Sequence, residues 1–162
     1  MIKKFKLGFM LCGAFIALAV INPFNATEAS AQAKGKTAVV EIKLGSNDMM
    51  QFDKKELKVK AGQKVKLTLT HTGKLAKTAM GHNFVLLAAG TDLAQFASKA
   101  NLARDTEYIP ASEKAKIIAY TKLIGGGESA VVEFTAPKKG TYPYVCSFPG
   151  HYAIMQGKLI VE

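Results

Sequence analysis

The chain has 162 residues, a formal net charge of +10 at pH 7 and two cysteines. This length predicts one domain that can bury a substantial core. The lysines are scattered along the sequence and are not gathered into one basic run with aromatic residues. The charge therefore favours a solvated basic surface, which attracts acidic partners, over a nucleic-acid groove, and we expect no nucleic-acid partner.

The N-terminus has the order of residues typical of a secretory signal peptide. Three lysines at positions 3, 4 and 6 precede an almost wholly apolar run over residues 7–21, and small residues follow at positions 29–33. The apolar run is shorter than the roughly 20 residues that a membrane-spanning helix needs. We therefore predict that residues 1–33 form a signal peptide that is removed on export.

The exported domain, residues 34–162, is expected to be periplasmic and to span no membrane. Cleavage is expected after Ala31 or Ala33, and the loss of three lysines and one glutamate lowers the net charge to +8. Cys12 leaves with the signal peptide, so Cys146 remains as a single cysteine and no disulfide can form within the domain. In an oxidising compartment, this thiol should be buried and inert, bound to a metal, or catalytic.

Alternation of apolar and polar residues with a period of two predicts half-buried strands along most of the domain. A continuous apolar run over residues 84–88 predicts a strand that is covered on both faces. Glycines and an Asn-Asp pair mark turns between these segments. We therefore predict an all-β fold, a two-sheet sandwich. The expected strands include residues 40–44, 57–59, 65–69, 84–88, 117–120, 130–134, 142–146 and 158–161.

One segment has a helical period. Apolar residues recur at helical spacing in the stretch from Asp92 to Ala103, and Thr91 can cap a helix there. A short helical insertion is therefore expected within the β fold. Residues 121–129 contain three consecutive glycines and predict a flexible hairpin loop.

The residues that carry chemistry lie near the C-terminus. Cys146, His151 and Met155 have the spacing C-x4-H-x3-M in a loop between the last two predicted strands, and His82 opens the buried strand. Two histidines and a cysteine in a trigonal plane, with a weak axial methionine, form a blue-copper electron-transfer site. Zinc is the alternative metal for such a set, although methionine would be an unusual fourth ligand.

Nearly the whole predicted mature chain resembles the azurins, which are type 1 blue copper proteins of the cupredoxin family. The spacing C-x4-H-x3-M separates the chain from plastocyanins and pseudoazurins, which have two residues between the cysteine and the histidine. The segments that carry the resemblance are Met80-Gly81-His82-Asn83, Cys146-Ser147-Phe148-Pro149-Gly150-His151, Met155-Gln156-Gly157, residues 121–125 and residues 47–52.

The resemblance implies a Greek-key cupredoxin sandwich that binds one copper ion. It implies three strong ligands, His82, Cys146 and His151, with Met155 as a long axial ligand on one side and the Gly81 carbonyl on the other. It also implies that Asn83 joins the two ligand segments by side-chain hydrogen bonds. A glycine at position 81 suits a close approach of the backbone to the metal.

A third histidine, His71, lies on the inward face of the strand predicted over residues 65–69. A lone histidine at such a position is usually a core residue with its hydrogen bonds satisfied. Azurins have a buried histidine here, which titrates in some members, so the resemblance also leaves open a pH-sensitive tuning role.

The function that the resemblance implies is an exported electron shuttle that alternates between Cu(II) and Cu(I) and is not an enzyme. Its expected partners are redox proteins such as c-type cytochromes and terminal reductases or oxidases. They are expected to dock near His151, Phe148 and Pro149, where azurins expose the edge of the loop histidine in an apolar patch. The other expected patch positions are Met50, Leu75, Met80, Gly150 and Ala153.

Three other functions remain open from the sequence. A copper carrier or storage protein is the main alternative. An enzyme would need a second metal site, for which three histidines are too few, and a metal-free adhesive sandwich would show no blue colour. The chain departs from azurins in having no N-terminal disulfide and in having Phe84 where many have a tryptophan, and neither change affects the expected ligands.

Overall fold

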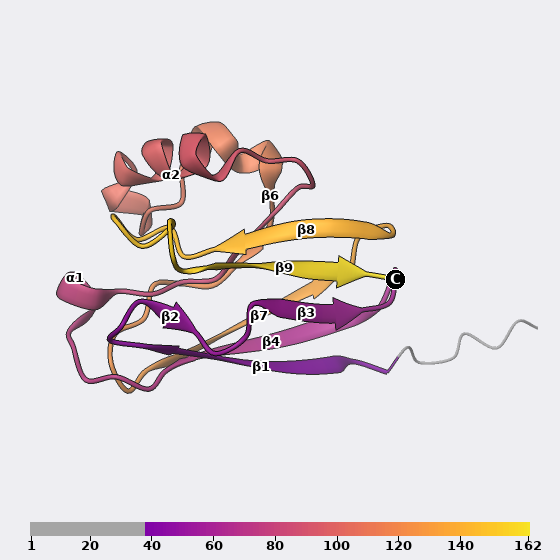
Figure 1. The fold of residues 1–162 in the computed structure, drawn as a ribbon, viewed down its shortest axis with the longest axis horizontal. Coiled ribbons are helices and arrows are strands. Elements are labelled where there is room, and N and C mark those ends of the chain that lie inside the picture. Colours follow the sequence, from indigo (N-terminus) through magenta and orange to yellow (C-terminus); the bar gives the residue numbers. More distant parts are fainter. Residues whose placement is uncertain (1–37) are drawn as a thin grey trace, which may run out of the picture. The chain divides into compact units, whose positions relative to one another are not determined.

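The computed structural model describes residues 38–162, and the predicted signal peptide lies outside this part of the chain. The described residues form two stacked β-sheets, as Figure 1 shows, so the predicted two-sheet sandwich is confirmed. One sheet has the strand order β2-β1-β4-β7, and the other has the order β3-β9-β8-β5-β6. The strands are β1 (Val40–Asn47), β2 (Gln51–Phe52), β3 (Glu56–Val59), β4 (Lys64–His71), β5 (Val85–Leu87), β6 (Ile117–Tyr120), β7 (Ser129–Thr135), β8 (Gly140–Val145) and β9 (Gln156–Val161).

The alternation of apolar and polar residues corresponds to half-buried strands, as predicted. Along β4, Val65, Leu67 and Leu69 are buried while the residues between them are partly exposed. Strand β4 lies between β1, with which it is parallel, and β7, with which it is antiparallel. The inward side chains of both sheets form one core, in which Tyr144 of β8 and Leu159 of β9 meet those of β4. This core holds the two sheets at a fixed separation beneath the loops that carry the candidate ligands.

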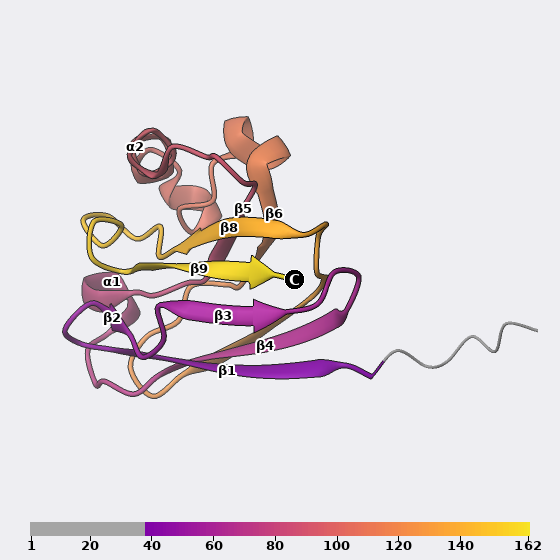
Figure 2. The same ribbon diagram turned by 45° about the vertical axis from the view of Figure 1, so that its right-hand side comes forward.

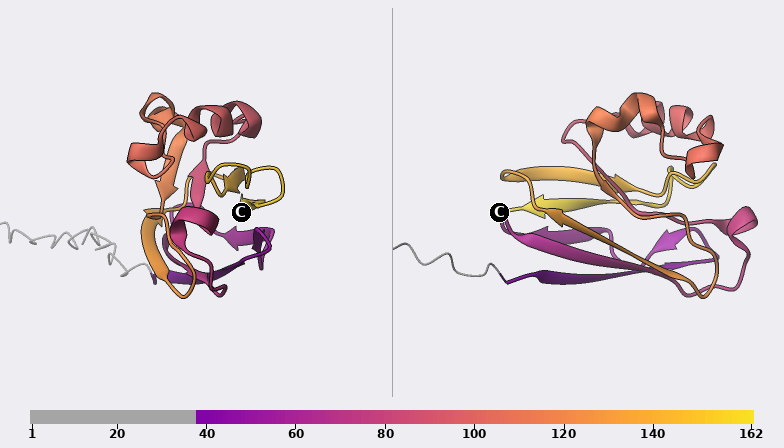
Figure 3. Two further views of the ribbon diagram at one scale, coloured as in Figure 1. Left: turned by 90° about the vertical axis from the view of Figure 1, so that its left-hand side faces the viewer. Right: turned by 180° about the vertical axis from the view of Figure 1, so that it is seen from behind.

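Strand β5 is covered on both faces, as its unbroken apolar sequence predicts. Leu86 belongs to the core between the sheets, whereas Val85 and Leu87 belong to a second cluster with Phe96 and Ala100. The helical insertion therefore packs on the outer face of the five-stranded sheet, where Figure 2 shows it above β8. Figure 3 shows the three layers that result, two sheets and the insertion.

The insertion is longer than the sequence predicted. Helix α2 (Leu93–Asn101) is followed by two 3-10 helices, η1 (Arg104–Thr106) and η2 (Ala111–Lys116), which the period of apolar residues did not indicate. The predicted cap is wrong by one residue, because Asp92 caps α2 by accepting a hydrogen bond from the Gln95 N–H. Thr91 instead donates its hydroxyl to the Ala88 carbonyl.

The glycine-rich segment over residues 121–128 is not a hairpin loop. It joins β6 to β7, which lie in different sheets, so it crosses from one layer to the other. It is also fixed by contacts, because Ile124 and His82 exchange two backbone hydrogen bonds of 2.9 Å. A one-turn helix, α1 (Lys77–Met80), precedes His82. None of the helices within residues 38–162 has the length and apolar character needed to cross a membrane.

Candidate metal centre

The candidate ligands come from separate segments that meet at the α1 end of the sandwich, on the left in Figure 1. His82 lies between α1 and β5, and its backbone is paired with Ile124. Cys146 follows the last residue of β8, and Met155 precedes the first residue of β9. Because β8 and β9 are antiparallel neighbours, the two ends of the loop between them, residues 146–155, lie side by side. We call this segment the ligand loop.

The three strongest metal-binding side chains converge on one point. The Cys146 Sγ lies 3.8 Å from the His82 Nδ1 and 3.6 Å from the His151 Nδ1. A metal in a trigonal plane, with bonds of about 2.0 Å to nitrogen and about 2.3 Å to sulfur, sets a nitrogen and a sulfur about 3.7 Å apart. The observed separations therefore match a metal bound between these atoms. Within residues 38–162, this is the one cluster of histidine, cysteine and acidic residues with that property.

The hydrogen bonds of His82 present its Nδ1 as a metal ligand. Its Nε2 lies 2.9 Å from the Asn47 carbonyl oxygen, which can only accept, so the proton is on Nε2. The lone pair of Nδ1 then points toward Cys146. A fixed tautomer of this kind is the usual contribution of an outer hydrogen bond to a metal-binding histidine.

The ligand loop is held by its own backbone. The His151 N–H donates to the Phe148 carbonyl, and the His151 carbonyl accepts from the Met155 N–H at 2.8 Å. The Cys146 N–H donates to the Met155 carbonyl at 2.9 Å, which closes the loop. Gly150 has a φ of 81°, a left-handed turn that glycine adopts without strain. These backbone hydrogen bonds therefore fix the conformation of the loop that carries the three candidate ligands.

Gly81 and Met155 complete the expected set. The Gly81 carbonyl oxygen lies 3.8 Å from the Cys146 Sγ. A Cβ at this position would lie 2.6 Å from the Lys77 carbonyl oxygen, so only glycine fits without movement of the backbone. Met155 is fully buried in the same core cluster as Cys146. The Gly81 carbonyl therefore faces the cluster, and Met155 is buried in the core at the end of the ligand loop.

Asn83 joins the two ligand segments as expected. Its Oδ1 accepts a hydrogen bond from the Ser147 N–H at 2.9 Å, and its Nδ2 donates to the Ser147 Oγ at 2.8 Å. Both residues are buried, so these bonds are shielded from water. Ser147 was not singled out from the sequence, because a serine beside a cysteine carries no signal until its partner is known.

Burial sets the protonation states of the candidate ligands. It lowers the pKa of His82 and of His151 to about 4 in each case, so both imidazoles are neutral near pH 7 and their lone pairs are free. Burial also raises the pKa of the Cys146 thiol to about 12, so the thiolate that binds a metal forms only with a cation present. Metal binding at neutral pH must therefore release a proton.

His71 is a core residue beside the centre and is not part of the donor cluster. Its ring is fully buried and lies 4.3 Å from the ring of His82, centroid to centroid. Its Nε2 is 3.0 Å from the Asp48 Oδ1, and Asp48 also accepts from the Lys74 and Leu75 N–H groups. The Lys74 N–H is the main reason that the pKa of Asp48 is lowered, so the carboxylate is charged and anchors this side of the centre.

The surface around the ligand loop is partly as expected. Leu75 is 45% exposed, and two exposed apolar residues that the sequence analysis missed, Met49 and Ile154, belong to the same end of the molecule. His151 is 3% exposed, so most of its ring is covered and at most an edge can reach the surface. The ring of Phe148 packs against it with a centroid distance of 4.7 Å.

Comparison with known proteins agrees with this geometry. The family described as copper binding proteins, plastocyanin/azurin family, matches residues 38–162. The chain belongs to this family. It is 41% identical over 126 residues to Azurin-1 of Alcaligenes xylosoxydans xylosoxydans, which covers 75% of this chain and 97% of that protein. It is 44% identical over 128 residues to the azurin of Achromobacter denitrificans, and this match covers 75% of this chain and 84% of that protein.

Solved structures of the plastocyanin/azurin type show the same fold. Auracyanin A, a "blue" copper protein of Chloroflexus aurantiacus, is 40% identical with a TM-score of 0.68, and the match covers 77% of this chain and all of that one. An azurin of Methylomonas sp. strain J is 32% identical with a TM-score of 0.68, covering 76% and 98%. The predicted cupredoxin sandwich with a helical insertion is thereby confirmed.

The cofactor that this family binds is copper, which agrees with the donor set. Two imidazoles and a thiolate, with a buried methionine, are typical of a type 1 copper site, so the prediction of copper is confirmed. Within the described residues, Cys146 is a free thiol. Phe84, which replaces the tryptophan of many azurins, fills the core against Tyr144 with a ring centroid distance of 5.3 Å.

Proposed function

We propose that this protein carries single electrons between redox partners outside the cytoplasm. In this proposal, His82, Cys146 and His151 hold copper as strong ligands, with Met155 and the Gly81 carbonyl as weak ligands on opposite sides. The observation that supports it most is the spacing of 3.6 and 3.8 Å between the Cys146 Sγ and the two Nδ1 atoms. Copper bound there supplies a one-electron couple between Cu(II) and Cu(I).

The rigidity of the site supports electron transfer over other uses of copper. The ligand residues are held by the Asn83–Ser147 pair, the hydrogen bond from His82 to Asn47 and the internal bonds of the ligand loop. Residues that are fixed by such contacts keep their positions when the charge of the bound ion changes. Small movement on electron exchange lowers the reorganisation that transfer requires, and it therefore favours rapid exchange.

Burial separates this proposal from a copper carrier or store. Cys146 and Met155 are fully buried, and His82 is too, so a chelator or an accepting protein cannot reach the donor atoms directly. A carrier needs ligands that a partner can replace one at a time. An enzyme needs an open coordination position or a second metal site, and within residues 38–162 only one donor cluster exists. We therefore propose that the protein is not an enzyme.

The proposed docking surface is the apolar end around the ligand loop. It includes Phe148, Pro149 and the covered ring of His151, with Met49 and Ile154 exposed beside them. Small apolar contacts suit weak and short-lived redox encounters. We propose c-type cytochromes and terminal reductases or oxidases as the partners, and we propose that the domain reaches the periplasm by removal of residues 1–33.

A reductive titration with a metal-exchange control tests this function. The copper-loaded protein should accept one electron per molecule reversibly, and it should keep its copper through many cycles in the presence of a small chelator. Reduction by a c-type cytochrome should be fast, and it should slow strongly when Ile154→Glu places a charge in the proposed docking surface. Rapid loss of copper to the chelator would instead support a carrier. Irreversible reduction, or consumption of a substrate, would contradict the shuttle.

A further inference from the structure

A strained turn in the helical insertion contacts both segments that carry the candidate ligands. Glu107 and Tyr108, which lie between η1 and η2, have φ values of 53° and 65°. Residues other than glycine rarely adopt this left-handed conformation, and two in succession persist only where the surrounding structure stabilises them. Such strain is commonly found at functional sites. We call these two residues the αL turn.

The side chain of Glu107 joins three elements at the metal end. Its Oε2 accepts a hydrogen bond from the Leu123 N–H at 2.9 Å, and its Oε1 lies 3.2 Å from the Lys77 Nζ. The Leu123 N–H and then the Lys77 ammonium hold the pKa of Glu107 below its usual range, so the carboxylate is charged. The Glu107 carbonyl also accepts from the Asn83 Nδ2 at 3.4 Å.

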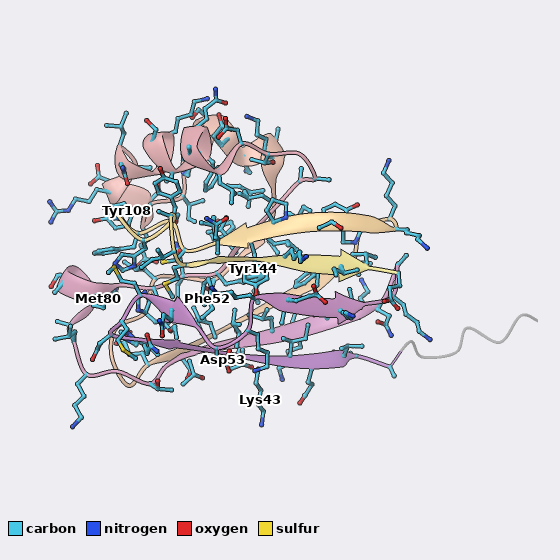
Figure 4. The ribbon with its side chains drawn as sticks, viewed as in Figure 1. Lys43, Phe52, Asp53, Met80, Tyr108 and Tyr144 are labelled. Carbon is cyan, nitrogen blue, oxygen red and sulfur yellow. The ribbon has the colours of Figure 1, made fainter. Side chains whose placement is uncertain are left out.

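The ring of Tyr108 reaches the ligand loop. It meets the ring of Phe148 edge-on, with a centroid distance of 5.2 Å and an interplanar angle of 71°. Phe148 in turn lies against His151. Figure 4 shows Tyr108 at the metal end, between the helical insertion and the ligand loop. The αL turn therefore contacts the segment before His82, the loop that contains Leu123 and the segment after Cys146.

These contacts converge on Gly81. A Cβ added to Gly81 would meet the Lys77 carbonyl oxygen at 2.6 Å and side-chain atoms of Leu123 and Phe148 at 2.9 Å each. These three residues enclose Gly81, and each of them is also a contact of the αL turn. Neither residue of the turn belongs to the donor cluster, so the turn acts on Gly81 through these three neighbours, while its carbonyl also contacts Asn83.

We propose that Glu107 and Tyr108 are positioning residues that fix the Gly81 carbonyl relative to Cys146 and thereby set the preference of the site for oxidised or reduced copper. This proposal rests on the proposed metal site. A carbonyl oxygen is a hard donor that stabilises Cu(II) more than Cu(I). If the enclosure of Gly81 loosens, its carbonyl moves toward the more highly charged ion. The oxidised state is then favoured, and the reduction potential falls.

The experiment compares Glu107→Ala with Glu107→Gln and with a matched control. Both Glu107 variants remove one negative charge, but the glutamine can still accept from the Leu123 N–H. The control is Asp53→Ala, because Asp53 also accepts from a backbone N–H, that of Gly45 at 2.8 Å, and also pairs with a lysine, Lys54 at 2.8 Å. The two carboxylates are similarly exposed, at 42% and 49%. Asp53 lies on the far side of the sandwich from the insertion, as Figure 4 shows.

We expect Glu107→Ala to lower the reduction potential below that of Glu107→Gln and to change the visible and electron paramagnetic resonance spectra of the copper-loaded protein. Glu107→Gln should keep the wild-type spectra, and so should Asp53→Ala. In the metal-free protein, the Leu123 amide should exchange its hydrogen faster in Glu107→Ala than in wild type or Glu107→Gln. Tyr108→Leu, which changes no charge, should also lower the potential and gives a second test if Glu107→Ala does not fold.

Two results have different meanings. If the wild-type protein binds no copper with a blue signal, the proposed metal site itself is overturned. If the wild type is blue but Glu107→Ala matches Glu107→Gln in potential, spectra and Leu123 exchange, the positioning role alone is overturned.

Discussion

The ligand loop and the helical insertion contribute to the same centre in different ways. The ligand loop carries Cys146, His151 and Met155 within ten residues, and its own backbone bonds hold them together. The insertion carries no candidate ligand, yet it covers β5, and its αL turn contacts the residues that enclose Gly81. The difference teaches that most of the candidate ligands come from one short local motif, whereas His82 and the contacts that support the site come from segments distant in sequence.

The largest effect on stability is expected in the insertion and should leave the metal chemistry intact. Phe96 is buried between α2 and the outer face of the five-stranded sheet. Phe96→Ala should lower the free energy of unfolding of the metal-free protein by about 3–5 kcal/mol, measured by urea titration, because it leaves a cavity there. The copper-loaded variant should keep its blue colour at low denaturant. Leu102→Ala, in the same insertion but 88% exposed, is the control and should change stability by less than about 0.5 kcal/mol.

Loss of copper binding by a folded Phe96→Ala variant would contradict this division of roles between the ligand loop and the insertion. It would mean that the insertion determines what the site binds and does more than support it.

A smaller effect is expected where the two regions are linked by Asn83. Asn83→Ala leaves the buried Ser147 N–H without its acceptor, which should cost about 1–3 kcal/mol in unfolding free energy. Copper affinity should fall by about 10- to 100-fold, as is typical when a residue that orients metal ligands is lost. Ser147→Ala keeps the backbone bond to Asn83 and should have a weaker effect on both. Competition titration with a copper chelator measures the affinity, and equal affinities for the two variants would contradict the assigned role.

The smallest expected effect is a pH dependence of folding stability that arises from Glu113 in the insertion. Glu113 is 3% exposed and pairs with Lys116 of η2 and Lys99 of α2. Lys116 first, and then Lys99, hold the pKa of Glu113 below its usual value. A lowered folded pKa gives stability above the unfolded pKa of about 4.3, and this stability is lost as the pH falls through the folded value.

The urea midpoints of wild type and Glu113→Gln should therefore differ most near pH 7 and approach each other as the pH is lowered below about 4. Midpoints that stay equally far apart over this range would show that the ion pairs do not respond to acid as described. The two midpoints should be measured on the metal-free proteins only, so that proton release from Cys146 on metal binding does not contribute.

The sequence predicted those parts of the molecule whose structure is determined by residues within one short segment. The alternation in β4, the unbroken apolar run of β5 and the ligand loop were all identified, because periodicity and motif spacing are local properties. The two 3-10 helices and the αL turn were not, because each depends on contacts with residues far along the chain. Residues 121–129 were mistaken for a hairpin loop, since three glycines predict a turn but do not say which strands it joins.

The same limit applied within the candidate site. Asn83 was placed correctly because it adjoins a candidate ligand in a recognisable motif. Ser147, the Asn47 carbonyl and Glu107 were missed, because their roles appear only when the segments that they join are seen together. The packing of Phe148 against the ring of His151 was also missed, since it cannot be inferred from their spacing.

The most direct test of the central claim is the visible absorption of the copper-loaded protein before and after Cys146→Ser. The serine variant should fold, because it replaces one buried atom of similar size. We expect an intense blue band in the wild type, from the bond between copper and the Cys146 thiolate, and no such band in the variant. A colourless oxidised wild type, or a variant that keeps the band, would contradict a metal held between His82, Cys146 and His151.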